Sequence, residues 1–302
     1  MASPCKCFHF VFIKNHSMKQ VAVIGLGAMG VVLAKLLIQN KLNVSVWNRT
    51  PGKLNQPGLE GAKATTNINE ALREASIVII CVKDYEATYE LLNGVSLEGK
   101  TIIQLSTGTP KDAKTMSAAF IDRGASYIDG AILATPSQMG RPDTPIFLSG
   151  NAEAFSKSED ILKVLGGGLL YMGDSAGAAS AWDLAVLTNM FGMMTGFLHG
   201  ARMMEAEGLK PSDLGNMIVN IAPVLAQMIQ DTGNDIDAGR FEDPQSSIDI
   251  CAQSFELMVR QAREANSDAS MPTFLLEFFD KGRKAGLGQN RISSLIKVLR
   301  NN

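Results

Sequence analysis

One acidic residue stands out in a long apolar stretch of the chain. Asp183 is the one carboxylate in residues 175–202, and residues 164–201 contain no lysine or arginine. Apolar surroundings disfavour the charged form of a carboxyl group, so we expect a raised pKa and a group able to donate a proton. Pairing with a basic residue from elsewhere in the chain is the alternative. At helical spacing the same face carries small or apolar residues, namely Ala179, Ser180, Leu187, Met190 and Met194.

A glycine-rich turn follows the first apolar run of the chain, QVAVI, and leads into an apolar helical pattern. In this context Gly25 allows a tight turn, Gly27 lets the backbone approach a pyrophosphate, and Gly30 lets the helix pack closely on the strand. The helix N-terminus adds a favourable field for the anion. The turn therefore predicts dinucleotide binding, with a strand-turn-helix that binds no ligand as the alternative. The predicted binding segment is Gly25, Leu26, Gly27, Ala28, Met29 and Gly30.

The end of the second predicted strand indicates which dinucleotide is bound. An NADH-binding protein usually has Asp or Glu here for the ribose hydroxyls, but this strand ends Asn48-Arg49-Thr50. Arg49 can stack on adenine and pair with a 2'-phosphate, Thr50 can donate a hydroxyl, and Lys53 adds positive charge. These residues favour NADPH, whereas a solvated basic turn without a ligand is the alternative.

Two further strand ends are expected at the same edge, because ligands of open α/β sheets lie beyond the carboxyl ends of the strands. Cys81, Val82 and Lys83 are predicted to pack on the adenosine part of the cofactor. Ser106 and Thr107 are predicted to bond the nicotinamide part or the substrate. Cys81 has no histidine or cluster of cations nearby in sequence, so we expect an inert thiol rather than a nucleophile.

The elements that must position these residues form two contrasting halves. Short apolar runs alternate with helical patterns up to about residue 173, which predicts a Rossmann-type, doubly wound and mostly parallel sheet. The rest of the chain is helical in period, which predicts an all-helical C-terminal domain. The expected strands are QVAVI, NVSVW, SIVIICV, TIIQL, SYIDGAIL, PIFLSG and LLYMG.

The segment 175–206 is apolar enough to raise the question of a membrane span. Asp183, Asn189 and His199 argue against a span, so we expect a long interdomain helix buried in protein. The expected domains are residues 18–174 for NADPH binding, 175–206 for this helix and 207–302 for dimerisation and substrate binding. His199 is expected at a helix surface or an interface.

The composition excludes several classes of partner. The chain has 28 basic and 30 acidic residues, so neither nucleic acid nor an anionic membrane is an expected partner. Its four cysteines lack zinc-site spacing and are too few for a disulfide framework. We therefore expect no metal site and a location in the reducing cytoplasm. Residues 1–17 are expected to be an extension and not a secretion signal, with a misassigned start codon and a targeting segment as alternatives. Cys5 and Cys7 within it are a weak candidate for metal binding.

Several motifs together resemble the NADPH-dependent imine reductases of the β-hydroxyacid dehydrogenase superfamily. The resemblance extends from Met18 to the end of the chain. It is carried by GLGAMG at 25–30, NRTPGK at 48–53, LSTGTPKDA at 105–113, DGAILATPSQMG at 129–140 and DSAGAASAWDLAVL at 174–187.

The position of Asp183 separates this chain from the wider superfamily. Hydroxyacid dehydrogenases have a catalytic lysine at the matching position and usually an asparagine one turn later, where this chain has Leu187. A lysine ammonium would repel a cationic iminium, whereas a carboxyl group can protonate an imine and then stabilise the iminium. The resemblance therefore implies that Asp183 is the catalytic residue of imine reduction, with cyclic imines as the expected substrates.

The resemblance also implies a homodimer whose active sites receive residues from both subunits. Alternatives are a hydroxyacid or short-aldehyde oxidoreductase that has exchanged its lysine, and a non-catalytic NADPH-binding protein. Most of the candidate substrate-binding residues are also suited to an ordinary core. They are Ala134, Pro136, Met139, Trp182, Leu187, Met190 and Met194, with Phe241 from the other subunit.

Overall fold

The structure, a computed structural model, describes residues 20–300. The extension expected at residues 1–17, with Cys5 and Cys7, lies outside the described residues. The described chain forms two compact units, and the boundary between them is the bond from Leu187 to Thr188. Each unit is described by itself.

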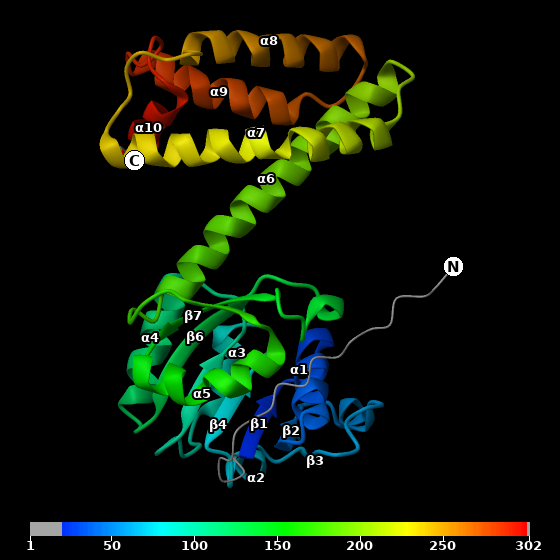
Figure 1. Ribbon diagram of the computed structural model, residues 1–302, viewed down its shortest axis with the longest axis vertical. Coiled ribbons are helices and arrows are strands. Elements are labelled where there is room, and N and C mark those ends of the chain that lie inside the picture. The colour runs from blue at the N-terminus through cyan, green and yellow to red at the C-terminus, as the bar shows by residue number, and fades with distance from the viewer. Residues whose placement is uncertain (1–19, 301–302) are drawn as a thin grey trace. The chain divides into compact units, whose positions relative to one another are not determined.

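The first unit contains an eight-stranded sheet in the order β3-β2-β1-β4-β5-β6-β7-β8 (Figure 1). All neighbouring strands are parallel except β6 and β7, so the predicted mostly parallel sheet is confirmed. Sequence analysis missed β3, a strand of three residues without an apolar run. The strands are β1 Gln20–Ile24, β2 Asn43–Trp47, β3 Lys63–Thr65, β4 Ile77–Ile80, β5 Thr101–Gln104, β6 Ser126–Ile132, β7 Pro145–Gly150 and β8 Gly168–Tyr171.

Helices cover both faces of this sheet, and the alternation of side chains along each strand divides the core between them. In β1, Val21 and Val23 pack in the core shared with α1 and α5, whereas Ala22 and Ile24 pack in the core shared with α2, α3 and α4. Burial on both faces explains why the central strands are continuous apolar runs. The helices are α1 Ala28–Gln39, α2 Ile68–Leu72, α3 Tyr85–Leu92, α4 Pro110–Ile121 and α5 Ala152–Leu165, with short 3-10 turns at Pro51–Asn55 and Pro136–Gln138.

The first-turn N–H groups of a helix need hydrogen-bond partners from outside the helix. Four helices of this unit receive them from a side chain at the position before the helix: Asn67 for α2, Asp84 for α3, Thr109 for α4 and Asn151 for α5. Helix α1 differs, because the residue before it is Gly27, no side chain caps it, and its first turn has no acidic residue.

The second unit is helical, as predicted. Helix α6, Ala178–Ala206, crosses the boundary between the units, and α7 follows at Pro211–Ala238. Helices α8, Ile248–Glu264, and α9, Ser270–Lys284, pack on each other around Ile248, Ala252 and Phe279. The unit ends with a 3-10 turn at Ile292–Leu295 and α10 at Ile296–Arg300. Within residues 20–300, no helix combines the length and hydropathy that a membrane crossing requires.

Candidate active site

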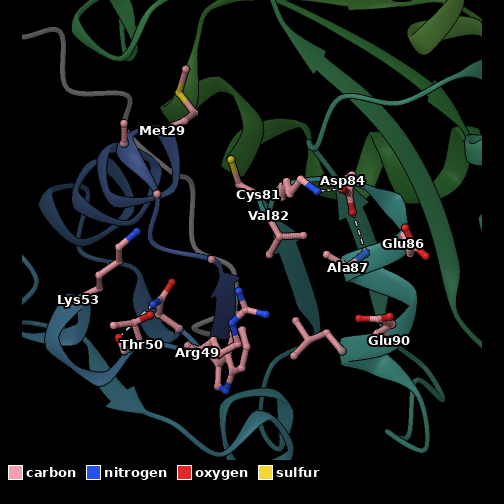
Figure 2. A pocket seen from close by; sticks show the side chains of 17 residues that line it. Met29, Arg49, Thr50, Lys53, Cys81, Val82, Asp84, Glu86, Ala87 and Glu90 are labelled. Atoms are coloured by element: carbon pink, nitrogen blue, oxygen red, sulfur yellow. Dashed lines mark hydrogen bonds and ion pairs between the residues drawn. The ribbon is translucent and has the colours of Figure 1, made fainter.

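A cavity of about 940 Å³ lies beyond the carboxyl ends of β1, β2 and β4 in the first unit. Figure 2 shows the turn after β1, the end of β2 and one side of α3 around it. This is the edge at which the sequence placed a dinucleotide. Eleven of the predicted cofactor residues line the cavity: Gly25, Gly27, Ala28, Met29, Asn48, Arg49, Thr50, Lys53, Cys81, Val82 and Lys83.

The turn between β1 and α1 depends on two glycines for different reasons. Gly25 has a φ of +98°, and a side chain there would overlap the carbonyl of Cys81. Gly30 lies inside α1, where a Cβ would overlap the carbonyl of Gly25. Both glycines therefore bring the start of α1 close to the strand ends. Gly30 and Leu26 are buried and do not line the cavity, so their part in binding is to shape the turn.

The start of α1 is suited to a pyrophosphate. Its uncapped first turn borders the cavity through Gly27, Ala28 and Met29. A Cβ at Gly27 would meet nothing within 4 Å, so the space beside this backbone is open. Uncapped N–H groups together with the helix dipole bind phosphate oxygens without any charged side chain. The local structure thus fits the diphosphate of a dinucleotide.

Asn48 joins this turn to the end of β2. Its side chain accepts a hydrogen bond from the N–H of Leu26 at 3.0 Å and donates one to the carbonyl of Thr50 at 3.0 Å. Arg49 and Lys53 are exposed at the cavity, and neither forms an ion pair within the described part of the chain. Their charges are therefore available to an anionic group such as a 2'-phosphate.

The far wall of the cavity belongs to α3 and was not predicted. The α3 residues that line the cavity are spaced three or four apart shortly after the end of β4, and this helical spacing is the sequence pattern that indicates them. Glu86 and Glu90 lie there across from Arg49 (Figure 2). The Lys83 ammonium is 3.2 Å from the Asp84 carboxylate, so part of its charge is already paired. The lining residues that sequence analysis missed are Trp47, Asp84, Glu86, Ala87, Glu90 and Leu91.

Three further predicted cofactor residues have supporting or separate positions. Burial raises the pKa of the Cys81 thiol to about 11, which agrees with the expected inert thiol. Ser106 is buried and its hydroxyl accepts a hydrogen bond from the N–H of Val82 at 3.0 Å, so it holds the β4 end in place. Thr107 is exposed and does not line this cavity.

Asp183 lies in the first unit, on the part of α6 that packs against the sheet. Its side chain is 6% exposed, and burial raises the pKa of its carboxyl group. Ala179 and Val186, on the same helix face, pack with Ala131 and Phe147. No ion pair to Asp183 occurs among residues 20–300. The predicted apolar environment of this carboxyl group is therefore present in the first unit.

The candidate substrate residues are divided between the two units. In the first unit Met139 is buried in the core beside α1, so its side chain has a packing role there, while Ala134 and Leu187 are half-buried and Pro136 is exposed. Trp182 is exposed and contacts the Phe147 ring at 6.0 Å between centroids. In the second unit Met190 and Met194 are exposed.

Phe241 lies in the second unit, where Lys297 and Arg291 contact the segment that carries it. The Lys297 ammonium lies 4.3 Å from the centre of its ring. The Arg291 N–H donates to the Phe241 carbonyl at 2.8 Å, and the Arg291 guanidinium donates to the Glu242 carbonyl at 2.7 Å. These contacts fix the segment that carries Phe241, whose role in substrate binding stays a prediction.

Two family descriptions match this chain almost from end to end. Residues 20–173 match the NAD binding domain of 6-phosphogluconate dehydrogenase. Residues 175–301 match the C-terminal domain of NADPH-dependent reductive aminase-like proteins. An NADPH-dependent reductive aminase from Aspergillus oryzae is 29% identical over 288 residues, which cover 93% of this chain and 97% of that protein.

Solved structures of reductive aminases and imine reductases are also similar to this chain. A reductive aminase from Aspergillus terreus in complex with NADPH and ethyl levulinate is 32% identical, with a TM-score of 0.86. The imine reductase BcSIRED from Bacillus cereus BAG3X2 is 29% identical, with a TM-score of 0.87. Both comparisons cover 94% of this chain and 100% of the other.

The two glycines of the turn provide a matched pair of tests. Gly30→Ala should lower the free energy of unfolding by about 1–3 kcal/mol, because its methyl group overlaps the Gly25 carbonyl. Gly27→Ala should change stability by less than about 1 kcal/mol, yet weaken dinucleotide binding about tenfold or more, because its methyl group enters the open space beside the helix. Urea unfolding without ligand and a binding titration measure the two effects. Equal loss of stability in both variants would contradict this assignment.

Proposed function

Because the chain belongs to the NADPH-dependent imine reductase and reductive aminase family, we propose that it reduces C=N bonds of small imines, cyclic imines included, to amines. The observation that carries the proposal is Asp183, a carboxyl group buried in an apolar part of α6 with a raised pKa. The coarser activity, that of an NAD(P)-dependent oxidoreductase, follows from the family.

The cofactor of the proposed reaction is NADPH, which supplies the hydride when bound. The backbone at the start of α1 would hold its diphosphate, and Gly27 leaves the necessary space. Arg49, Thr50 and Lys53 would hold the 2'-phosphate, since both cations are free of ion pairs among the described residues. The α3 wall would pack on the adenosine part.

Asp183 would act on the substrate nitrogen. Its raised pKa keeps a proton on the carboxyl oxygen to higher pH than an exposed aspartate would, so the proton is available to an imine nitrogen. Once the proton has moved, the carboxylate faces an iminium cation of opposite charge. A lysine at this position, as in the hydroxyacid dehydrogenases, would repel that cation.

A second candidate is reduction of an aldehyde or oxidation of a hydroxyacid. The match of residues 20–173 to a dehydrogenase domain is compatible with this reaction as well as with imine reduction. The two candidates differ in the group beside the substrate, and a carboxylic acid at position 183 favours a basic nitrogen over an alcohol or a carbonyl oxygen.

We further propose that the protein is a homodimer with shared active sites. Helix α7 has 28 residues, of which Asp235 is the buried one. An apolar stripe of this size on a helix surface is typical of a protein interface. The exposed members of the stripe recur at helical spacing: Met217, Ile221, Val224, Leu225 and Met228.

Replacement of Asp183 tests the proposed reaction. Asp183→Asn should lower kcat for a cyclic imine of the 1-pyrroline type about 100-fold or more, because an amide cannot supply the proton. NADPH affinity should stay within about twofold of the wild type, since Asp183 does not line the dinucleotide cavity. In the wild type kcat should fall as pH rises through the raised pKa of Asp183, and the variant should lack this decline.

The control for this variant is Asp174→Asn. Asp174 is an exposed carboxylate shortly before α6 that accepts a hydrogen bond from the Tyr171 hydroxyl at 2.5 Å, so the control should keep wild-type kcat. Wild-type turnover by Asp183→Asn at every pH would refute the role of Asp183. Turnover of hydroxyacids or short aldehydes but not imines would support the second candidate, and NADPH binding without any turnover would support a non-catalytic protein.

Replacement of Arg49 tests the cofactor preference. Arg49→Ala should weaken NADPH binding about tenfold or more, because it removes a charge-assisted bond to the 2'-phosphate, and should weaken NADH binding much less, because only the contact with the adenine is lost there. Arg73→Ala, at an exposed arginine after α2, is the matched control. The affinities follow from quenching of protein fluorescence. An equal loss for both cofactors would mean that Arg49 does not recognise the 2'-phosphate.

The proposed homodimer can be tested by placing a charged residue in the apolar stripe of α7 and measuring the molecular mass in solution. Light scattering should give twice the 32.4 kDa of one chain. Val224→Asp should shift the protein toward the monomer, because a buried unpaired charge opposes association. Gln230→Asp, in the last third of α7 and on the face opposite the stripe, should leave the dimer intact. A monomeric wild type at micromolar concentration would contradict the proposal.

A further inference from the structure

Side chains of the sheet hold the first turn of α6, in addition to the local bond from the N–H of Ala178 to the Ser175 carbonyl at 2.9 Å. The N–H of Ala179 donates to the Ser149 hydroxyl at 2.9 Å, and the N–H of Ser180 donates to the Asp129 carboxylate at 3.2 Å. Ser149 and Asp129 are opposite each other in the register of β7 and β6. The sheet therefore satisfies N–H groups that other helices of this unit satisfy locally.

Asp129 is the centre of this arrangement. It is completely buried and also accepts a hydrogen bond from the Ser180 hydroxyl at 2.6 Å. On its other oxygen it accepts a short hydrogen bond from the Tyr85 hydroxyl. A buried carboxylate is stable only when such donors surround it, and the positive end of α6 adds to their effect.

Tyr85 connects Asp129 to the wall of the dinucleotide cavity. It is the first residue of α3 and directly follows Lys83 and Asp84, which line that cavity. Its ring lies against Gly108, where a Cβ would overlap it. One carboxylate thus contacts both α3, which borders the cofactor, and α6, which carries Asp183 one turn beyond Ser180.

We propose that Asp129 is a positioning residue for the reaction: it fixes the first turn of α6 relative to α3 and thereby fixes Asp183 relative to the cofactor wall. The inference rests on the proposed function of Asp183. Asp129 does not line the dinucleotide cavity, and it acts through Ser180 and Tyr85.

The proposal has a consequence for pH dependence. Burial raises the pKa of Asp129 to about 6, against the opposing effect of its hydrogen-bond donors. The polar groups facing it are Tyr85 from α3, Tyr127 from its own strand and Ser180 from α6, and no cation forms an ion pair with it within residues 20–300. As pH falls through this pKa, the protonated carboxyl loses acceptor capacity and the positioning weakens. This acid-side decline is distinct from the alkaline decline expected of Asp183.

Kinetics of Asp129→Asn test the proposal with NADPH and a cyclic imine. The amide keeps the shape but has one acceptor oxygen, so kcat should fall about fivefold or more while KM and NADPH affinity change less than about twofold. The wild-type decline in kcat near pH 6 should be absent from the variant. Ser180→Ala, a smaller change that keeps the N–H bond, should give a smaller loss of kcat.

Tyr171→Phe is the matched control. It breaks a different hydrogen bond between a tyrosine hydroxyl and a carboxylate, that of Tyr171 to Asp174 at 2.5 Å, and this pair makes no bond to the first turn of α6. Its kcat and pH profile should equal those of the wild type. The proposal would be overturned if both Asp129→Asn and Ser180→Ala had the wild-type kcat and the same decline in kcat near pH 6 as the wild type.

Hydrogen exchange provides a readout that needs no turnover. The amides of Ala179 and Ser180 should exchange about tenfold faster or more in Asp129→Asn than in the wild type or Tyr171→Phe. Unchanged exchange in a protein that reduces imines would overturn the positioning role and leave the proposed function intact. If the wild type reduces no imine but the exchange is faster in Asp129→Asn, the proposed function is overturned, while the role of Asp129 in holding the first turn of α6 is supported.

Discussion

The need of every helix N-terminus for hydrogen-bond acceptors organises the first unit of this protein. Each strand-to-helix connection ends in a set of N–H groups that the helix itself does not pair. Helices α2 to α5 satisfy them with a local side chain. Helix α1 leaves them open beside a cavity, and α6 receives acceptors from β6 and β7. The unit thus contains helix starts that are capped locally, one start that is open to a ligand, and one that is held by side chains of the sheet.

This division explains how a chain with nearly balanced charge binds a polyanionic cofactor. The attraction comes from the orientation of backbone dipoles and from two cations that lack ion pairs among the described residues, rather than from an excess of basic residues. It also explains why glycine is required in the turn before α1. Any side chain at Gly25 or Gly30 would collide with a backbone carbonyl and move the helix away from the strand ends.

The sequence predicted features that depend on neighbouring residues. The strands appeared as apolar runs, the glycine turn as a motif, and the cationic turn at Arg49 as a departure from an acidic residue. The short strand β3 has no such apolar run, so it was missed. Glu86 and Glu90 were missed because predicting them required knowing which face of α3 borders the cavity. The Asp129 cluster depends on the register of β6 with β7 and on Tyr85, 44 residues away in sequence. No local pattern reports such a contact.

The substrate side was harder to predict because Met and aromatic residues at helical spacing serve equally well as core. Met139 illustrates this, since it packs beside α1 although its motif suggested a pocket wall. The buried, apolar surroundings of Asp183 were easier to predict, because a carboxylate isolated in an apolar stretch is unusual in itself, whatever its spacing.

Helix α7 has a consequence for how the second unit folds. A helix that buries a single residue of 28 within its own chain gains little from the core of that chain, and Pro223 in its interior removes a backbone hydrogen bond as well. Its stability must come from whatever covers the apolar stripe. In the proposed homodimer, folding and association of this unit are one equilibrium, so its midpoint of unfolding depends on protein concentration, and dilution favours the unfolded chain.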